Sequence, residues 1–205
     1  MKDESRNLLY KSATVYKLIM RLLYGQHYGT RCARIAELIP ANSTVLDLCC
    51  GPAVLYHQHL RHKSVHYTGI DVSSQFVDAL TKQGIPAILC DLRSNTALPH
   101  ADYVVMQASL YHFLPNASHI LDRMLDAARK QVIVAEPIRN LATSQIPIIS
   151  TIAGRVSGPV VEASAQRFTE EALDRFFRSY STKVIQSFTI AGGREKVYVL
   201  DKSAT

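Results

Sequence analysis

Short apolar runs alternate with longer amphipathic segments over the middle of the chain. The runs are rich in Val and Ile and short enough to be buried strands; they span residues 45–48, 65–70, 87–90, 103–106 and 132–135. Between them, helix-like patterns cover residues 53–62, 73–83 and 116–130. Because strands and helices alternate regularly, the pattern predicts a parallel sheet that helices cover on both faces.

The pattern changes near the C-terminus. Residues 167–177 (RFTEEALDRFF) start with a capping Thr169 and two acidic residues, which favours a helix. Two strand-like segments, 183–190 and 195–200, are joined by AGGR, and a Gly-Gly connection is typical of a hairpin. The sequence therefore predicts an α/β fold: a Rossmann-like, doubly wound sheet of seven strands, mostly parallel, with an antiparallel C-terminal hairpin.

Two segments fall outside this alternation. Residues 5–39 carry an apolar stripe with basic residues beside it, and they predict two helices before the first strand. Residues 138–166 mix Pro and Gly with apolar residues, and a connection of that length often forms a lid. We therefore expect an N-terminal helical cap over residues 1–40 and a core over residues 41–205, with the lid-like insertion inside that core.

Composition narrows the class of protein. The 205 residues suit one domain, and 47% apolar residues are enough for a proper core. We expect no transmembrane helix and no secretion signal, because long apolar runs are missing and residues 1–7 have mixed charge. Four cysteines without disulfide-like spacing favour a cytoplasmic location. The net charge of +6 is concentrated near the N-terminus, where it either attracts an acidic partner or forms a solvated helix face.

The stretch VLDLCCGPA (residues 45–53) is the strongest candidate for a ligand site. Asp47 lies near the end of the first strand, and Gly51 with the following proline begins the turn into a helix. In an open α/β sheet a ligand lies over such a turn. The turn has one glycine, with Cys49 and Ala53 at other small positions, so it suits a nucleoside without a pyrophosphate better than a dinucleotide.

Acidic residues also end the next two strands. Asp71 follows Gly51 by 20 residues (71 − 51), the spacing at which an acid reaches ribose hydroxyls. The third strand ends at Asp91. Because three consecutive strands end in Asp, we expect their carboxylates to line one edge of the sheet and to accept hydrogen bonds from an amino group, a ribose and an adenine amine.

Together these motifs resemble the class I S-adenosylmethionine-dependent methyltransferases. The similarity rests on VLDLCCGPA, YTGIDVSSQFV, ILCDLR, ADYVVMQASLYHFL, QVIVAEP and the terminal hairpin, over residues 40–200. Cys49 and Ala53 replace two glycines that are frequent in the family's first motif. The resemblance implies S-adenosyl-L-methionine as cofactor, S-adenosyl-L-homocysteine as product and methyl transfer as the reaction.

The resemblance also implies which residues hold the cofactor. The backbone from Asp47 through Cys49 to Gly51 would hold the methionine part, and Asp71 the ribose. Asp91 with Leu92 would flank the adenine, and Gln107 with Ala108 would form the far wall of the site. Val72 is a further cofactor-binding residue. We expect no metal. Cys49 and Cys50 have no second Cys pair, and the histidines of YHQHLRH do not share one helix side.

The acceptor is harder to predict. Tyr24 and Tyr28, with the apolar segment 138–166, favour a small-molecule or lipid-like acceptor in a closed chamber, with peripheral membrane contact as an extension of that idea. The basic N-terminus leaves an RNA or other nucleic-acid methyltransferase as an alternative, although no nucleic-acid module is visible. A second alternative is a nicotinamide-dependent oxidoreductase or a non-catalytic nucleoside-binding protein. The pattern predicts no oligomeric state.

Three residues are candidates for catalysis. His112 follows the fourth strand and would lie beside the transferred methyl group, where it could take a proton from the acceptor. Tyr111 would line the same pocket, and Glu136 at the end of the fifth strand is a rival base. The other interpretation is that His112 packs against the following helix and that alignment of the reactants alone drives transfer.

Overall fold

A computed structural model describes residues 27–138 and 167–204 of the chain. Predictions that fall on other residues lie outside the described part: the first cap helix, Tyr24 and the lid-like segment after Ile138. Tyr28 belongs to helix α3 (His27–Glu37), but its side chain is not described. The division into a cap and a core therefore stays a prediction for most of the cap.

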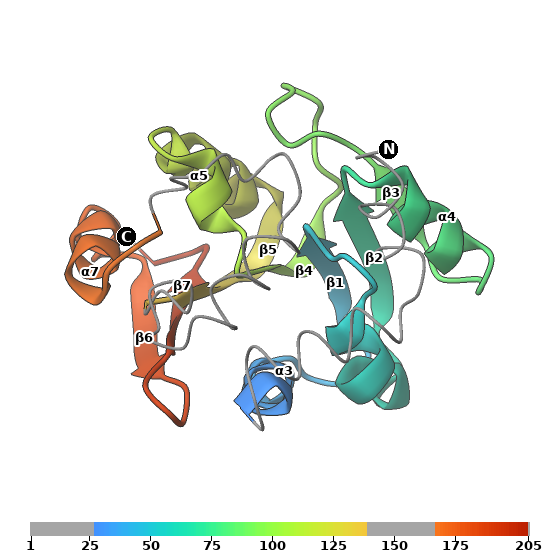
Figure 1. Ribbon diagram of the computed structural model, residues 1–205, viewed down its shortest axis with the longest axis horizontal. Helices are drawn as coiled ribbons and strands as arrows, with labels where there is room; N and C mark the ends of the chain where they lie inside the picture. The colour runs from blue at the N-terminus through green and yellow to red at the C-terminus, as the bar shows by residue number, and fades with distance from the viewer. Residues whose placement is uncertain (1–26, 139–166, 205) are drawn as a thin grey trace, which may run out of the picture.

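Seven strands form one sheet in the order β3-β2-β1-β4-β5-β7-β6 (Figure 1). Their bounds are β1 Thr44–Leu48, β2 His66–Asp71, β3 Ala87–Leu89, β4 Ala101–Gln107, β5 Ala128–Pro137, β6 Val184–Thr189 and β7 Glu195–Asp201. Strands β1 to β5 pair in parallel, and β7 is antiparallel to both β5 and β6. The predicted fold class is confirmed: a doubly wound, mostly parallel sheet that ends in an antiparallel hairpin.

Helices cover both faces of this sheet (Figure 1). Helices α5 (Ala117–Ala127) and α7 (Glu170–Arg178) pack on one face, and their buried residues belong to the same core cluster as Leu46 and Leu48 of β1. Helix α3 and the π-helical turn η1 (Tyr56–Leu60) pack on the other face, which includes Val45. Helix α4 (Ser74–Thr81) connects β2 to β3. Because both faces are covered, the strands read in the sequence as nearly continuous apolar runs.

Two predicted helices differ from the structure. The helix expected over residues 116–130 ends at Ala127, because β5 already begins at Ala128, which pairs with Ala101 of β4. Because β5 pairs with β4 from Ala128 onward, the strand includes polar residues that lie before its apolar run. The apolar pattern alone therefore places the start of the strand too late. The helix expected over 53–62 continues as the π-helix η1 and the 3₁₀-helix η2 (Arg61–Lys63). Apolar spacing alone cannot distinguish these turns from an α-helix.

The lysine at the end of η2 joins that turn to helix α3. Lys63 donates hydrogen bonds to the carbonyl oxygens of Ala36, at 2.6 Å, and of Ile39. A cation at the C-terminal end of a helix satisfies carbonyls that have no partner within the helix. This contact fixes α3 on the sheet, and α3 carries part of the site described below.

Candidate functional site

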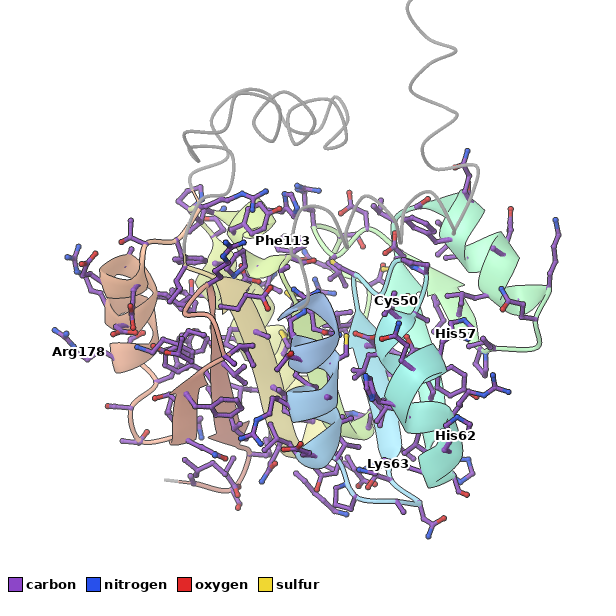
Figure 2. All side chains as sticks on the ribbon, turned by 60° about the horizontal axis from the view of Figure 1, so that its bottom comes forward. Cys50, His57, His62, Lys63, Phe113 and Arg178 are labelled. Carbon is purple, nitrogen blue, oxygen red and sulfur yellow. The ribbon has the colours of Figure 1, made fainter. Side chains whose placement is uncertain are left out.

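The candidate site lies where the parallel strands end. In Figure 2, Cys50 and Phe113 are labelled at one end of the sheet, whereas His62 and Lys63 lie at the opposite end. Cys50 follows β1, and Phe113 belongs to the short 3₁₀-helix η3 (Leu110–Phe113) that follows β4. The turns after β1, β2, β3 and β4 therefore meet at one edge, as expected for parallel strands.

The turn after β1 has an unusual backbone. Cys49, Gly51 and Ala53 have φ angles of 55°, 52° and 50°, in the left-handed region. Glycine adopts this conformation freely, whereas for other residues it costs roughly 1–2 kcal/mol. The chain therefore holds two strained residues, Cys49 and Ala53, within five positions. Such strain is typical of sites where the backbone must approach a ligand.

Asp71 at the end of β2 ties this turn to the second strand. Its Oδ2 accepts a hydrogen bond from the Gly51 N–H at 2.8 Å, and its Oδ1 accepts one from the Ser73 N–H at 2.8 Å. Burial raises the pKa of this carboxyl, while the backbone N–H donors act to lower it. A carboxylate offers about four acceptor positions, so each Asp71 oxygen can still accept a hydrogen bond from a ribose hydroxyl.

The residue after Asp71 fits the other part of a nucleoside. Val72 is 66% exposed, and few large apolar residues in the described chain are as open to solvent. An exposed apolar side chain provides a surface on which the flat face of a base can lie. The edge therefore offers a hydrogen-bond-accepting carboxylate and an exposed apolar side chain at consecutive positions.

The three strand-end aspartates differ in exposure, and Asp71 is itself only 9% exposed. Asp47 is buried and accepts a hydrogen bond from the Tyr67 hydroxyl at 2.9 Å; burial raises its pKa to about 7. Asp91 is exposed, and its Oδ1 accepts from the backbone N–H of Arg93 at 2.9 Å, while Leu92 is buried in the core. The three carboxylates thus share one end of the sheet, but they differ in exposure, and Asp47 faces the protein interior.

The end of β4 turns sharply out of the sheet. Gln107 accepts a weak hydrogen bond from the Cys32 thiol of α3 at 3.7 Å. Ala108 has a φ of 49°, and its N–H donates to the carbonyl oxygen of Ala135 at 2.7 Å. This positive φ redirects the chain into η3, and the role of Gln107 and Ala108 in cofactor binding stays a prediction.

Glu136 of β5 holds the segment that follows. Its Oε1 accepts hydrogen bonds from the N–H groups of Ser109 and Leu110 at 2.7 and 2.8 Å. Its other oxygen, Oε2, is buried without a hydrogen-bond partner among the described residues. Burial raises the pKa of Glu136 to about 7. In the described structure Glu136 is a buried hydrogen-bond acceptor that fixes the start of η3.

Tyr111 and His112 are neighbours on η3, with ring centroids 4.0 Å apart. Tyr111 is largely buried, and His112 is partly buried. Burial lowers the pKa of His112 to about 4, assisted by the positive charges of Arg167 and Arg93. The imidazole is therefore neutral at neutral pH. It is a weak base, but it can accept a hydrogen bond.

A buried ion pair lies beneath this edge, and the sequence pattern did not predict it. Arg31 of α3 donates to Glu195 at the start of β7, with 2.5 Å between Nη1 and Oε1. Both side chains are almost fully buried. The positive charge of Arg31 also opposes the rise in the pKa values of Asp47 and Glu136. An arginine on the apolar side of a predicted helix was the available signal in the sequence.

The predicted absence of a metal stays a prediction. Within residues 27–138 and 167–204, no three His, Cys, Asp or Glu side chains are grouped so that they could hold a metal ion. The four cysteines are all free thiols, and burial raises the pKa of Cys49 to about 12. In the same two ranges, no helix has the length and apolar character needed to cross a bilayer.

Gly69 of β2 lies beside the strained turn. A Cβ added at Gly69 would lie 2.6 Å from the Cys50 sulfur and 3.3 Å from the Tyr67 hydroxyl. We expect Gly69→Ala to cost roughly 1–3 kcal/mol of unfolding free energy by overpacking. Urea unfolding of Gly69→Ala, Cys50→Ala and the double variant tests this. The double variant should recover part of the loss, and strict additivity would contradict the predicted contact.

Comparisons with known proteins identify a family for this chain. The family model described as methionine biosynthesis protein MetW matches residues 30–162. No curated protein sequence gives a significant match.

Solved structures give the same picture of the fold. Magnesium protoporphyrin IX methyltransferase of Synechocystis PCC 6803 with bound SAH has a TM-score of 0.65 at 13% identity, over 97% of this chain and 99% of that chain. The same enzyme with bound SAM has a TM-score of 0.62 at 12% identity, over 97% of each chain. A TehB-like SAM-dependent methyltransferase of Corynebacterium glutamicum has a TM-score of 0.54 at 14% identity, over 83% and 86%. At such identities the likeness shows the fold.

Proposed function

Because the chain belongs to the methionine biosynthesis protein MetW family and is a class I S-adenosylmethionine-dependent methyltransferase, we propose that it transfers a methyl group to a small-molecule or lipid-like acceptor. The cofactor is S-adenosyl-L-methionine, and the product is S-adenosyl-L-homocysteine. The cofactor supplies a methyl group that is already activated by a sulfonium. The protein therefore has to bind, align and exclude water rather than provide strong acid–base chemistry.

The observation that carries the proposal is the pair of hydrogen bonds at Asp71. They join the turn at Gly51 to the end of β2 and leave lone pairs that fit ribose hydroxyls. Exposed Val72 beside it fits adenine, and the left-handed backbone at Cys49 to Ala53 allows close approach of the methionine part. These residues would hold the cofactor.

The acceptor side of the proposal rests on η3. Phe113 provides partly exposed apolar ring surface at the end of β4, and the neutral, partly buried His112 precedes it in the chain. This surface supports an acceptor with apolar character and a group that donates a hydrogen bond to the imidazole. We place the reaction in the cytosol, in agreement with four free thiols.

The proposal is tested with a panel of small-molecule and lipid acceptors, together with RNA, and with isotopically labelled S-adenosylmethionine. We expect label to enter at least one small-molecule or lipid acceptor and to depend on Asp71. Label that enters RNA alone would contradict the acceptor class. Failure of the chain to bind S-adenosylhomocysteine would contradict the cofactor assignment.

The low pKa of His112 predicts a specific pH dependence. Because this pKa is about 4, the imidazole should not change its protonation state between pH 6 and 8, and turnover should show no limb there that belongs to His112. His112→Asn keeps a hydrogen-bond acceptor, so it should leave the profile unchanged. A limb near pH 6.5 that disappears in His112→Asn would show instead that the histidine acts as a base in the complex.

A further inference from the structure

Two arginines from distant parts of the chain meet on η3. Arg93 follows β3, and Arg167 precedes α7. The Cζ of Arg93 lies 5.4 Å from the Phe113 ring centroid, and the Cζ of Arg167 lies 4.8 Å from the Tyr111 ring centroid. Arg93 also donates from Nη2 to the carbonyl oxygen of His112 at 3.3 Å. Both guanidinium groups therefore lie beside the same four-residue turn. Arg167 lies against the ring that precedes His112 in the chain, and Arg93 lies against the ring that follows it.

The described residues neutralise this positive charge only in part. Arg93 contacts Asp91, with 3.6 Å between Nη1 and Oδ1, and both side chains are about half exposed. An ion pair so open to water is weak. For Arg167, no carboxylate of residues 27–138 or 167–204 lies within ion-pair distance. After burial, the positive charges of Arg167 and Arg93 also act to lower the pKa of His112.

The rings hold the guanidinium groups without using their N–H donors. A guanidinium beside an aromatic ring is attracted by the ring's quadrupole, and its edge N–H groups stay available for a planar anion. Arginine binds carboxylate and phosphate through two parallel hydrogen bonds, which orients the anion as well as attracting it. Arg93 already donates from Nη2 to the His112 carbonyl oxygen, so an anion would use its other N–H groups together with those of Arg167.

We propose that Arg93 and Arg167 bind the anionic group, a carboxylate or a phosphate, of the methyl acceptor. This inference rests on the proposed function, because it places the acceptor at the end of β4. The anion would be held by the two guanidinium groups, and the apolar part of the acceptor would contact Phe113, which is partly exposed. The charged end of the acceptor then fixes its orientation, so its nucleophile is presented to the cofactor side of η3.

His112 offers a local reporter for this site that needs no knowledge of the acceptor. Its ring signals are followed by NMR in the full chain, with and without saturating S-adenosylhomocysteine, and are assigned through their loss in His112→Asn. The probes are acetate, methyl phosphate and the neutral control acetamide, all at constant ionic strength. We expect acetate or methyl phosphate to shift the His112 signals saturably, whereas acetamide leaves them in place. The tighter of the two anions identifies the acceptor's anionic group.

Matched arginine variants decide the role of the two side chains. Arg93→Gln and Arg167→Gln should each weaken anion binding roughly tenfold, the loss expected for a charge-assisted hydrogen bond. Arg129→Gln is the control, since this exposed arginine lies near the start of β5, at the far end of the sheet. A wild-type chain with no saturable shift, or variants that bind the anion as well as wild type, would overturn the inference.

The cofactor assay separates this inference from the proposed function. Arg167→Gln should bind S-adenosylhomocysteine with wild-type affinity, because Arg167 lies against the Tyr111 ring, whereas Arg93 also contacts Asp91, the predicted neighbour of the adenine. Loss of anion binding with intact cofactor binding supports the acceptor site. If wild type binds the anion but not S-adenosylhomocysteine, the proposed function fails while the anion site stands.

Discussion

Asp71→Ala is expected to weaken binding of S-adenosylhomocysteine by roughly tenfold or more, because it removes a charge-assisted acceptor worth about 1.5–3 kcal/mol. The structure adds a second reason. The substitution also leaves the Gly51 and Ser73 N–H groups without their acceptor, so the turn that holds the methionine part is released. Isothermal titration calorimetry of wild type and variant measures the effect.

Two further variants, Asp71→Asn and Asp78→Asn, test this expectation. Asp71→Asn retains one acceptor oxygen but places an NH₂ group against a backbone N–H, so it should also bind the cofactor poorly. Asp78→Asn changes an exposed carboxyl on the neighbouring helix α4 and should bind as wild type does. Urea unfolding checks that the variants are folded. Folded Asp71 variants with wild-type affinity would remove Asp71 from the site.

Glu136→Ala is expected to lower the unfolding free energy by at least about 2 kcal/mol, because two buried N–H groups lose their acceptor at a cost of about 1–3 kcal/mol each. These donors belong to Ser109 and Leu110, which begin η3. The same loss should reduce methyl transfer by misplacing Tyr111 and His112. Urea unfolding and single-turnover assays of the variant measure both effects.

Glu136→Gln is the matched control, because it keeps an acceptor oxygen for both N–H groups. Its comparison with wild type also isolates the titration of Glu136. Burial raises the folded-state pKa to about 7 from an ordinary value of 4.5, so between these values the folded chain binds more protons than the unfolded chain.

The unfolding free energy of wild type should therefore fall, relative to Glu136→Gln, as the pH rises from 5 to 7, by at most about 1.4 kcal/mol per pH unit. Parallel stability curves for wild type and Glu136→Gln would show that Glu136 is not titrating in this range. A Glu136→Ala variant as stable as wild type would show that η3 does not depend on Glu136.

The local sequence pattern predicted the architecture because each signal acts over a few residues. Short runs of Val and Ile marked the strands, and Thr169 marked the start of α7, where its side chain accepts from the Ala172 N–H at 3.2 Å. The glycines of AGGR, Gly192 and Gly193, do have positive φ angles in the β6–β7 connection. Parallel strands place all their carboxyl ends at one edge, so the position of Asp71 at this edge could be predicted from the sequence.

The same signals failed where backbone pairing overrides side-chain pattern. Strand β5 starts at Ala128, inside the predicted helix 116–130, because β4 provides hydrogen-bond partners there. The left-handed conformations of Cys49 and Ala53 could not be predicted from the sequence either, because among residue types only glycine commonly indicates such a backbone. Tertiary contacts hold these residues in strained conformations that their own side chains do not favour.

By itself the sequence determined the order of strands and helices, the turn at Gly51 and the carboxylate at Asp71, because these depend on local periodicity and on the shared edge of a parallel sheet. Only the tertiary structure decided which polar groups meet. Arg31 and Glu195 are 164 positions apart, and Glu136 reaches back 27 positions to Ser109. Arg93 and Arg167 meet on η3 from different ends of the core. Such pairings arise when distant segments pack together, and no local pattern records them.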